Sequence, residues 1–253
     1  MRIVAGCCQH ENYEHSLMIF NHCQEICNKY GFEYYAKASF DKANRSSLGG
    51  KRGPEFNEWH KSFSEYQKMG FKTLTDVHEA SQIEKIEDVV DVIQIPAFLC
   101  RQTDLLMEAC KTDKIINIKK GQFLAPWDMK GILSKTGDAK EVWITERGTS
   151  FGYNQLVVDF TGIRYMLDNY DVDVVADATH SVQRPGGNGS SSGGNRDYAS
   201  WVAFAAAACG VRSFFLEVHE DPDNAPSDGP NMIYLDDFES VVKRLSEIIE
   251  VMK

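Results

Sequence analysis

The sequence predicts a single α/β domain over residues 1–253, folded as a (β/α)8 TIM barrel. A chain of 253 residues with 43% hydrophobic residues has the size and composition of one large globular domain. Short apolar runs alternate with helical segments, as expected for parallel strands that helices cover from outside. The eight expected strands are residues 3–6, 33–40, 72–77, 89–96, 115–120, 141–147, 172–178 and 213–218. Eight such units in about 250 residues match a barrel, and a doubly wound open sheet is the alternative.

Helical periodicity supports this order, most clearly near the two ends of the chain. After the first strand, apolar residues recur at helical spacing, and Gly31 follows them as a stop signal. The residues of that face are Ile19, Cys23, Ile26, Cys27 and Tyr30. A second apolar face runs through residues 236–251 and predicts the last helix. We expect both helices to cover the outside of the barrel.

The charge balance restricts the partners that the protein can have. The chain carries 27 Lys and Arg against 37 Asp and Glu, a net charge of −10. Nucleic acids and anionic membranes both favour a basic surface, so neither is expected as a partner. A small anionic substrate stays compatible, because a local cluster of cations can create a positive field inside an acidic protein.

The sequence pattern predicts neither a membrane-spanning segment nor a signal peptide. The longest apolar run, residues 201–209, is shorter than the roughly 20 residues that cross a bilayer. The N-terminus lacks the apolar stretch of a signal peptide. The seven cysteines form an odd number without framework spacing, which indicates reduced core thiols. We therefore expect a soluble cytoplasmic protein in which Cys8 alone is a candidate for chemistry.

A low-complexity segment follows the seventh expected strand. Residues 186–194 read GGNGSSSGG, and such a composition cannot pack a core. The segment is therefore expected to be a mobile loop. Its place at the C-terminal end of a barrel strand favours an active-site loop over an inert linker.

Basic residues gather at the C-terminal ends of the expected strands, where barrels carry their chemistry. These residues are Lys37, Lys42, Arg45, Lys120 and Arg147, with Lys119 beside them. Cations that converge on one barrel mouth repel each other unless an anion neutralises them. The pattern predicts a substrate with more than one phosphate or carboxylate group. The alternative interpretation is that these lysines and arginines are exposed on the surface and bind no substrate.

A second group at the strand ends mixes sulfur, nitrogen and oxygen ligands. It consists of Cys8, His180, Glu217 and Asp228. Such a set suits a borderline divalent metal. The four residues are scattered along the chain, so a core thiol beside a hydrogen-bonded histidine is an equally open interpretation.

Long motifs then resemble one enzyme family in a single order along the chain. They are KASFDKANRSS (37–47), RGP (52–54), TDVHE (75–79), QIPAFLCRQTDLL (94–106), KKGQFLAPWDMK (119–130), TERGTSFGYNQLVVD (145–159), DATHSVQRPGG (177–187) and DPDNAPSDGPNM (221–232). The sequence resembles the 3-deoxy-D-manno-octulosonate 8-phosphate synthases. The related 3-deoxy-arabino-heptulosonate 7-phosphate synthases share the barrel, but their sequence is usually closer to KPRTSP where this chain has KANRSS. Sialic acid synthases are more distant relatives.

The resemblance implies an aldol-like condensation without a Schiff base. Phosphoenolpyruvate attacks the aldehyde of D-arabinose 5-phosphate through C3, water adds to C2, and inorganic phosphate leaves with cleavage of the C–O bond. The product is a precursor in lipopolysaccharide biosynthesis. Two alternatives are the same chemistry on another aldose phosphate, such as erythrose 4-phosphate, and a barrel that binds sugar phosphates without turnover.

The resemblance also assigns residues to the two substrates. Those that match the phosphoenolpyruvate site are Lys42, Gln94, Lys120, Arg147 and His180. Those that match the aldose phosphate site are Lys37, Asn44, Arg45 and Ser46, with Asp76 nearby. Relatives are commonly homotetramers, and Arg101 is expected to reach the aldose phosphate of a neighbouring subunit.

The same resemblance implies a metal-dependent form with a divalent transition metal, Zn, Fe or Mn. The metal-dependent form has Cys in a G-P-C string where the other form has Asn, and here the string is Gly6-Cys7-Cys8. The implied ligands are Cys8, His180, Glu217 and Asp228. Adjacent strand residues point to opposite faces, so only one of the two thiols can face the interior. The next residues, QHEN (9–12), depart from the hydrophobic pair followed by Glu-Ser that the family usually has.

Overall fold

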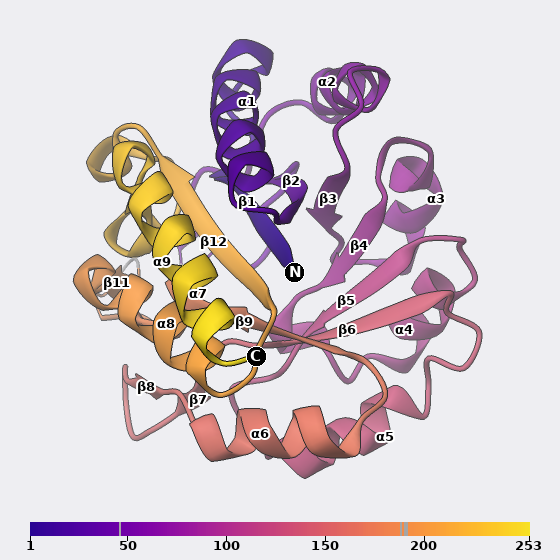
Figure 1. Ribbon diagram of the computed structural model, residues 1–253. Helices are drawn as coiled ribbons and strands as arrows, with labels where there is room; N and C mark the ends of the chain where they lie inside the picture. Colours follow the sequence, from indigo (N-terminus) through magenta and orange to yellow (C-terminus); the bar gives the residue numbers. More distant parts are fainter. Residues whose placement is uncertain (46, 188, 190–191) are drawn as a thin grey trace.

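A closed barrel of eight parallel strands forms the centre of the protein (Figure 1). The computed structural model describes residues 1–45, 47–187, 189 and 192–253. The barrel strands, in order around the barrel, are β1 (Arg2–Gln9), β2 (Glu33–Ser39), β3 (Thr73–Asp76), β4 (Val92–Ile95), β5 (Ile115–Lys119), β6 (Glu141–Glu146), β9 (Asp173–Asp177) and β12 (Ser213–His219). Because β12 pairs in parallel with β1, the sheet closes on itself. The barrel is confirmed with all eight expected strands, and the open sheet is excluded.

Helices follow the strands and lie around the outside of the barrel (Figure 1). They are α1 (Tyr13–Lys29), α2 (Phe56–Lys68), α3 (Ile83–Ile86), α4 (Thr103–Cys110), α5 (Met129–Leu133), α6 (Phe160–Asn169), α7 (Ala178–Ser181), α8 (Ala199–Ala208) and α9 (Phe238–Val251). The Asn12 side chain accepts the His15 N–H at the start of α1, and Gly31 follows the helix with a φ of 74°. Both end helices therefore form where their periodicity predicts. Among the described helices, none combines the length and apolarity that crossing a membrane requires.

Short strands extend the loops at the C-terminal end of the barrel. They are β7 (Thr149–Ser150) with β8 (Leu156–Val157), β10 (Gln183–Arg184) with β11 (Gly193–Gly194), and β13 (Ile233–Tyr234) beside β12. The Gly-rich segment expected to be a loop thus ends in a strand that pairs with β10. Residues 188, 190 and 191 of that segment lie outside the described residues.

The barrel interior changes from apolar to polar along seven of its eight strands. The lower layer is a cluster of buried apolar side chains, Val4, Tyr35, Leu74, Val92, Trp143, Val175 and Phe215. Two residues further along six of these strands, the same face carries a buried polar side chain, and on β5 Asn117 follows the partly buried Ile115 in the same way. This upper layer consists of Lys37, Asp76, Gln94, Asn117, Thr145, Asp177 and Glu217. Burying so many polar groups is costly unless they are paired, so the upper layer marks the functional end of the barrel.

Candidate active site

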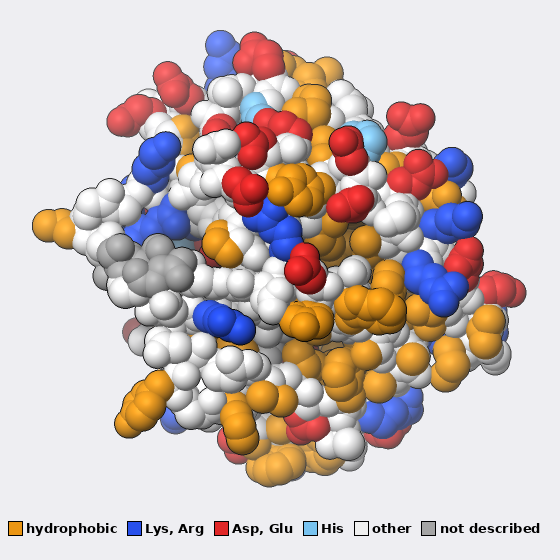
Figure 2. All heavy atoms as spheres, turned by 90° about the vertical axis from the view of Figure 1, so that its left-hand side faces the viewer, with side chains coloured by type: hydrophobic (Ala, Val, Ile, Leu, Met, Phe, Trp, Pro, Cys, Tyr) orange, Lys and Arg blue, Asp and Glu red, His pale blue; other side chains and the backbone are white. Residues whose placement is uncertain are grey.

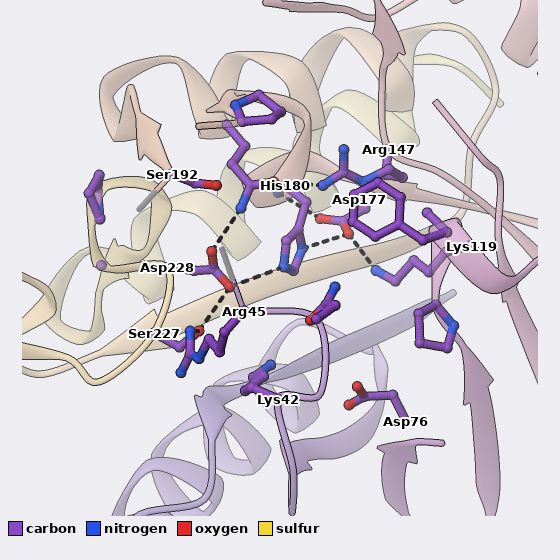
Figure 3. A pocket seen from close by; sticks show the side chains of 18 of the residues that line it. Lys42, Arg45, Asp76, Lys119, Arg147, Asp177, His180, Ser192, Ser227 and Asp228 are labelled. Atoms are coloured by element: carbon purple, nitrogen blue, oxygen red, sulfur yellow. Dashed lines mark hydrogen bonds and ion pairs between the residues drawn. The ribbon is translucent and has the colours of Figure 1, made fainter. Parts of the chain in front are cut away.

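A cavity of about 380 Å³ opens at the C-terminal ends of the strands (Figure 3). Its volume suits a small organic ligand. Nine of the residues expected at the site line it, namely Lys37, Lys42, Asn44, Arg45, Asp76, Gln94, Arg147, His180 and Asp228. Gly186 and Ser192 from the Gly-rich segment line it as well, which places that segment at the site rather than in an inert linker.

Lys120 does not line the cavity, and Lys119 takes its place. Asn117 points into the barrel, so by alternation Lys119 also points inward and Lys120 points outward. The Lys120 Nζ lies 3.3 Å from a carboxylate oxygen of Glu146 and donates to the Leu124 carbonyl at 3.1 Å. The expectation that Lys120 lies at the site is therefore wrong: Lys119 lines the cavity instead, as strand alternation indicates.

Two other expected residues are not seen at the cavity. Ser46 lies outside the described residues. Arg101 is exposed after β4, and its carbonyl accepts a hydrogen bond from Lys135 at 3.0 Å. Within the described residues, Arg101 does not line the cavity of its own barrel.

Three cations that line the cavity have only neutral partners. Lys42 donates to the Ser39 hydroxyl at 2.9 Å, and Arg147 Nη2 donates to Gln183 Oε1 at 2.9 Å. Arg45 bonds to amide, hydroxyl and carbonyl oxygens. In the described part of the chain, no carboxylate lies within 4.0 Å of these three side chains. Their charge is therefore available to an anion in the cavity.

Arg147 has the clearest unused binding capacity of the three. Its Nη1 is buried and has no hydrogen-bond partner among the described residues. Burial lowers the pKa of the Arg147 guanidinium, although Asp177 and Asp228 at longer range favour its charge. A buried donor without a partner is unfavourable, so a ligand oxygen that accepted from Nη1 would be strongly favoured.

Two further cavity lysines are paired with carboxylates. Lys37 Nζ donates to Glu217 Oε1 at 3.0 Å and to the Cys8 carbonyl at 2.9 Å. Lys119 donates to Asp177, toward which it points in Figure 3. Burial lowers the pKa of Lys119 to about 8, because desolvation outweighs the attraction of Asp177. Lys119 can therefore lose its charge within an accessible pH range.

The four residues of the mixed ligand set come together beside the cavity. One ligand atom from each of Cys8, His180, Glu217 and Asp228 lies within 4.8 Å of the others. Cys8 Sγ is 3.3 Å from Asp228 Oδ2, and His180 Nε2 is 3.4 Å from Glu217 Oε2. That Glu217 oxygen is buried and has no hydrogen-bond partner in the described chain. A sulfur, a nitrogen and two carboxylates at this spacing fit a divalent transition metal.

Neighbouring groups orient this set. Asp177 Oδ2 lies 2.8 Å from His180 Nδ1, so Nε2 faces the other three ligand atoms. Burial opposes the charge of His180, but Asp177 and Glu217 outweigh it and raise its pKa well above the usual value. Gln183 Nε2 donates to Asp228 Oδ1 at 2.8 Å. Asp177 and Gln183 are site residues that the sequence analysis did not single out.

The two adjacent cysteines lie in different environments. Cys7 packs in the apolar layer outside the barrel, 3.5 Å from the Ser16 hydroxyl, and burial raises its pKa to about 12. The β1–β2 register shifts between Ala5 and Cys8, and Cys8 has a φ of 63°. This left-handed conformation is unfavourable for a residue with a side chain, and it turns Cys8 toward Asp228. Only Cys8 therefore reaches the ligand set.

A second group of ligand-type side chains, Glu11, His15 and His219, lies outside the cavity lining. His219 Nδ1 accepts the Asp221 N–H at 2.9 Å, so its Nε2 carries the proton and donates to Glu11 Oε1 at 2.9 Å. With both ring nitrogens used in this way, His219 has no lone pair for a metal. This group is a hydrogen-bonded cluster.

Comparison with known proteins gives matches over the whole chain. The model of the DAHP synthetase I family matches residues 1–253. The chain belongs to the DAHP synthetase I family. A relative from Chelativorans sp. (strain BNC1), named 2-dehydro-3-deoxyphosphooctonate aldolase, is 49% identical over 256 residues, which cover 100% of this chain and 92% of the relative. Relatives of that name from Agrobacterium fabrum and Rhodopseudomonas palustris are 50% and 49% identical and cover 96% and 100% of this chain. The matches cover 87% and 89% of those two relatives.

Proposed function

We propose that this enzyme condenses phosphoenolpyruvate, D-arabinose 5-phosphate and water to 3-deoxy-D-manno-octulosonate 8-phosphate and inorganic phosphate. A three-carbon enolpyruvate and a five-carbon aldose phosphate together give an eight-carbon 2-keto-3-deoxy acid phosphate. That product is the compound in the name of the relatives. The observation that carries the proposal is the set of three cavity cations with neutral partners, because both substrates are multiply charged anions.

The two substrates are assigned to different parts of the cavity. Arg147 and Lys119 bind the anionic groups of phosphoenolpyruvate, with Gln94 beside them. Arg45 binds the terminal phosphate of the aldose, and Asn44 binds a sugar hydroxyl. Cations held in place before the reaction stabilise the charge that develops at C2 and at the aldehyde oxygen. Holding two anions in line also removes much of the entropic barrier to their reaction.

The electrostatic surroundings of the two substrates are completed by Lys37, Lys42, Asp76 and His180. Burial opposes ionisation of Asp76, but His78 and Lys42 outweigh it and hold its pKa well below the usual range. Asp76 therefore stays a carboxylate, and the Ser39 hydroxyl donates to it. Burial likewise opposes the charge of Lys42, yet Cys8 and Asp76 raise the pKa of Lys42 above its usual value. Lys42 thus remains a cation throughout the neutral range.

The reaction forms one C–C bond and one C–O bond, the latter from water, and breaks the C–O bond that joins C2 to the phosphate. C3 of phosphoenolpyruvate attacks the aldehyde carbon, and the aldehyde oxygen becomes a hydroxyl. Water adds to C2 and gives up the proton that the new alkoxide takes. The resulting hemiketal phosphate then loses inorganic phosphate by cleavage of its C2–O bond, which leaves the C2 ketone. Arg147 and Lys119 hold the phosphoryl and carboxylate oxygens in place throughout.

We further propose that Cys8, His180, Glu217 and Asp228 hold a divalent transition metal, Zn²⁺, Fe²⁺ or Mn²⁺. The donor set and the unpartnered Glu217 oxygen support this assignment. A metal bound there would polarise and orient the aldehyde or the attacking water.

The choice of aldose separates this proposal from its closest alternative. With arabinose 5-phosphate and erythrose 4-phosphate supplied together, we expect the eight-carbon product to predominate, as read by mass spectrometry. Predominance of the seven-carbon product would instead support the heptulosonate reaction. Binding of both aldoses without any consumption of phosphoenolpyruvate would identify a non-catalytic barrel.

We propose a homotetramer in the cytoplasm that supplies lipopolysaccharide precursors. Exposed apolar side chains gather in the lower half of the face shown in Figure 2, as expected for a surface that packs against another copy. Phe151, Tyr153 and Trp201 are among the exposed apolar residues of the protein. Sedimentation velocity at working enzyme concentration tests the assembly, and a monomer that retains full activity would contradict it.

The pH dependence of turnover tests the role of Lys119. Because burial lowers its pKa to about 8, Lys119 is a cation below that pH and neutral above it. We expect kcat/KM for phosphoenolpyruvate to fall as the pH rises through about 8. Lys119→Arg should move this fall to higher pH, since arginine keeps its charge. Lys120→Arg, the matched control, should leave the fall in place. A fall that responds only to Lys120→Arg would contradict the role of Lys119.

A further inference from the structure

The departure from the family pattern after Cys8 has a structural counterpart at Gln9. Gln9 is the last residue of β1, and only 5% of its surface is exposed. Its Oε1 accepts a hydrogen bond from Arg45 Nη2 at 2.6 Å. Arginine has donors only, so the Gln9 carbonyl oxygen, not its NH2 group, must face the guanidinium. A hydrophobic residue at this position could not make the contact.

The other partners of Arg45 all come from loops. Its Nε donates to the Lys51 carbonyl at 2.7 Å, Nη1 to the Ser227 hydroxyl at 2.9 Å, and Nη2 to the Pro226 carbonyl at 3.2 Å. Gln9, in contrast, belongs to a barrel strand that pairs with β2 on one side, where Gln9 is opposite Ser39. Among these partners, Gln9 alone is a residue of a barrel strand, so its hydrogen bond fixes the guanidinium relative to the barrel.

A neutral acceptor suits this position better than a carboxylate would. Arg45 lines the cavity, and its four partners among the described residues are all neutral, so none of them balances its positive charge. A carboxylate in place of Gln9 would neutralise that charge and compete with an incoming phosphate. The amide oxygen holds the guanidinium without cancelling its charge.

We infer that Gln9 is a positioning residue that holds Arg45 ready for the terminal phosphate of the aldose. The inference rests on the proposed function, which assigns that phosphate to Arg45. Gln9 itself is absent from the described lining of the cavity, so it acts through Arg45 rather than on the substrate. Its effect is therefore expected in the binding of the phosphorylated aldose and not in the binding of phosphoenolpyruvate.

Gln9→Leu removes the acceptor at nearly unchanged volume. Loss of a hydrogen bond to a charged group should raise KM for arabinose 5-phosphate about tenfold, with an unchanged KM for phosphoenolpyruvate and unchanged bound metal. Gln9→Glu should raise the aldose KM further, because its charge competes with the phosphate. Gln24→Leu, on α1 where Gln24 donates to Asn28, is the matched control and should change neither KM. An equal rise in both KM values for Gln9→Leu would indicate a merely structural role and overturn the inference.

A double-mutant cycle separates the inference from the function on which it rests. In an Arg45→Ala background, Gln9→Leu should have no further effect on the aldose KM. With unphosphorylated arabinose as substrate, Gln9→Leu should match the parent enzyme. If Arg45→Ala leaves the aldose KM unchanged, the proposed role of Arg45 is wrong and the inference falls with it. If Arg45→Ala raises the aldose KM and Gln9→Leu does not, the inference is overturned and the proposed function stands. The same conclusion follows if the effects of the two substitutions on that KM multiply in the double variant.

Discussion

Arg147→Ala is expected to lower kcat/KM for phosphoenolpyruvate by at least about 100-fold while the barrel stays folded. A charge-assisted hydrogen bond contributes about 1.5–3 kcal/mol, and loss of alignment in the transition state adds to that loss. Stability should not fall, because burial already disfavours the charged form of Arg147 in the ligand-free protein. Steady-state kinetics and thermal unfolding of the same preparation measure both effects.

The control for this variant is Arg164→Ala. Arg164 is an exposed residue of α6 that pairs with Asp168 on the same helix, so its removal should leave both kinetic constants unchanged. Near-normal kcat/KM for Arg147→Ala at saturating aldose would show that Arg147 does not bind phosphoenolpyruvate. A large loss of thermal stability together with activity would mean that the Arg147 guanidinium has a structural role.

Cys8→Ala should lose both bound metal and activity, and Cys7→Ala should keep both. Cys8 Sγ faces Asp228, whereas Cys7 packs against Ser16 on the other side of the strand. Metal content by elemental analysis and turnover on the same samples distinguish the two thiols. Because both residues are buried cysteines of β1 and only Cys8 reaches the ligand set, each variant serves as the control for the other.

The same site predicts how chelators and acid affect the enzyme. A chelator should inactivate the parent enzyme, and a divalent transition metal should restore it. Metal must displace protons from Cys8 and from His180, whose pKa is raised, so metal affinity should fall as the pH falls. Full activity in a preparation shown to be free of metal would place this protein in the metal-independent form, with Cys8 as a core thiol.

Much of the fold followed from local patterns. The apolar runs predicted all eight barrel strands, since parallel strands covered by helices are buried on both faces. The basic residues at the expected strand ends include all five Lys and Arg residues that line the cavity in the described structure, because barrels place the C-terminal ends of all strands at one mouth. The motif match indicates Lys120 as the substrate-binding lysine. The alternation of side chains from Asn117 to Lys119 indicates instead that Lys119 faces inward.

The remaining site residues depend on contacts between distant segments. Gln183 joins Arg147 to Asp228, and Gln9 joins β1 to Arg45, yet nothing in the sequence near these glutamines indicates such partners. The left-handed backbone of Cys8 has no local signal either, since Asn, Asp and Gly are the residues that usually adopt it. These features arise only when the closed barrel brings the loops together.

Phosphoenolpyruvate is expected to give up its phosphate only as its C3 joins an aldose phosphate. The most direct test uses phosphoenolpyruvate labelled with ¹⁸O in the bridge between C2 and phosphorus, with and without arabinose 5-phosphate. We predict phosphate release only with the aldose, in equal amount to the eight-carbon product, and with the label retained in the phosphate. Release without the aldose, or unlabelled phosphate from P–O cleavage, would contradict the account.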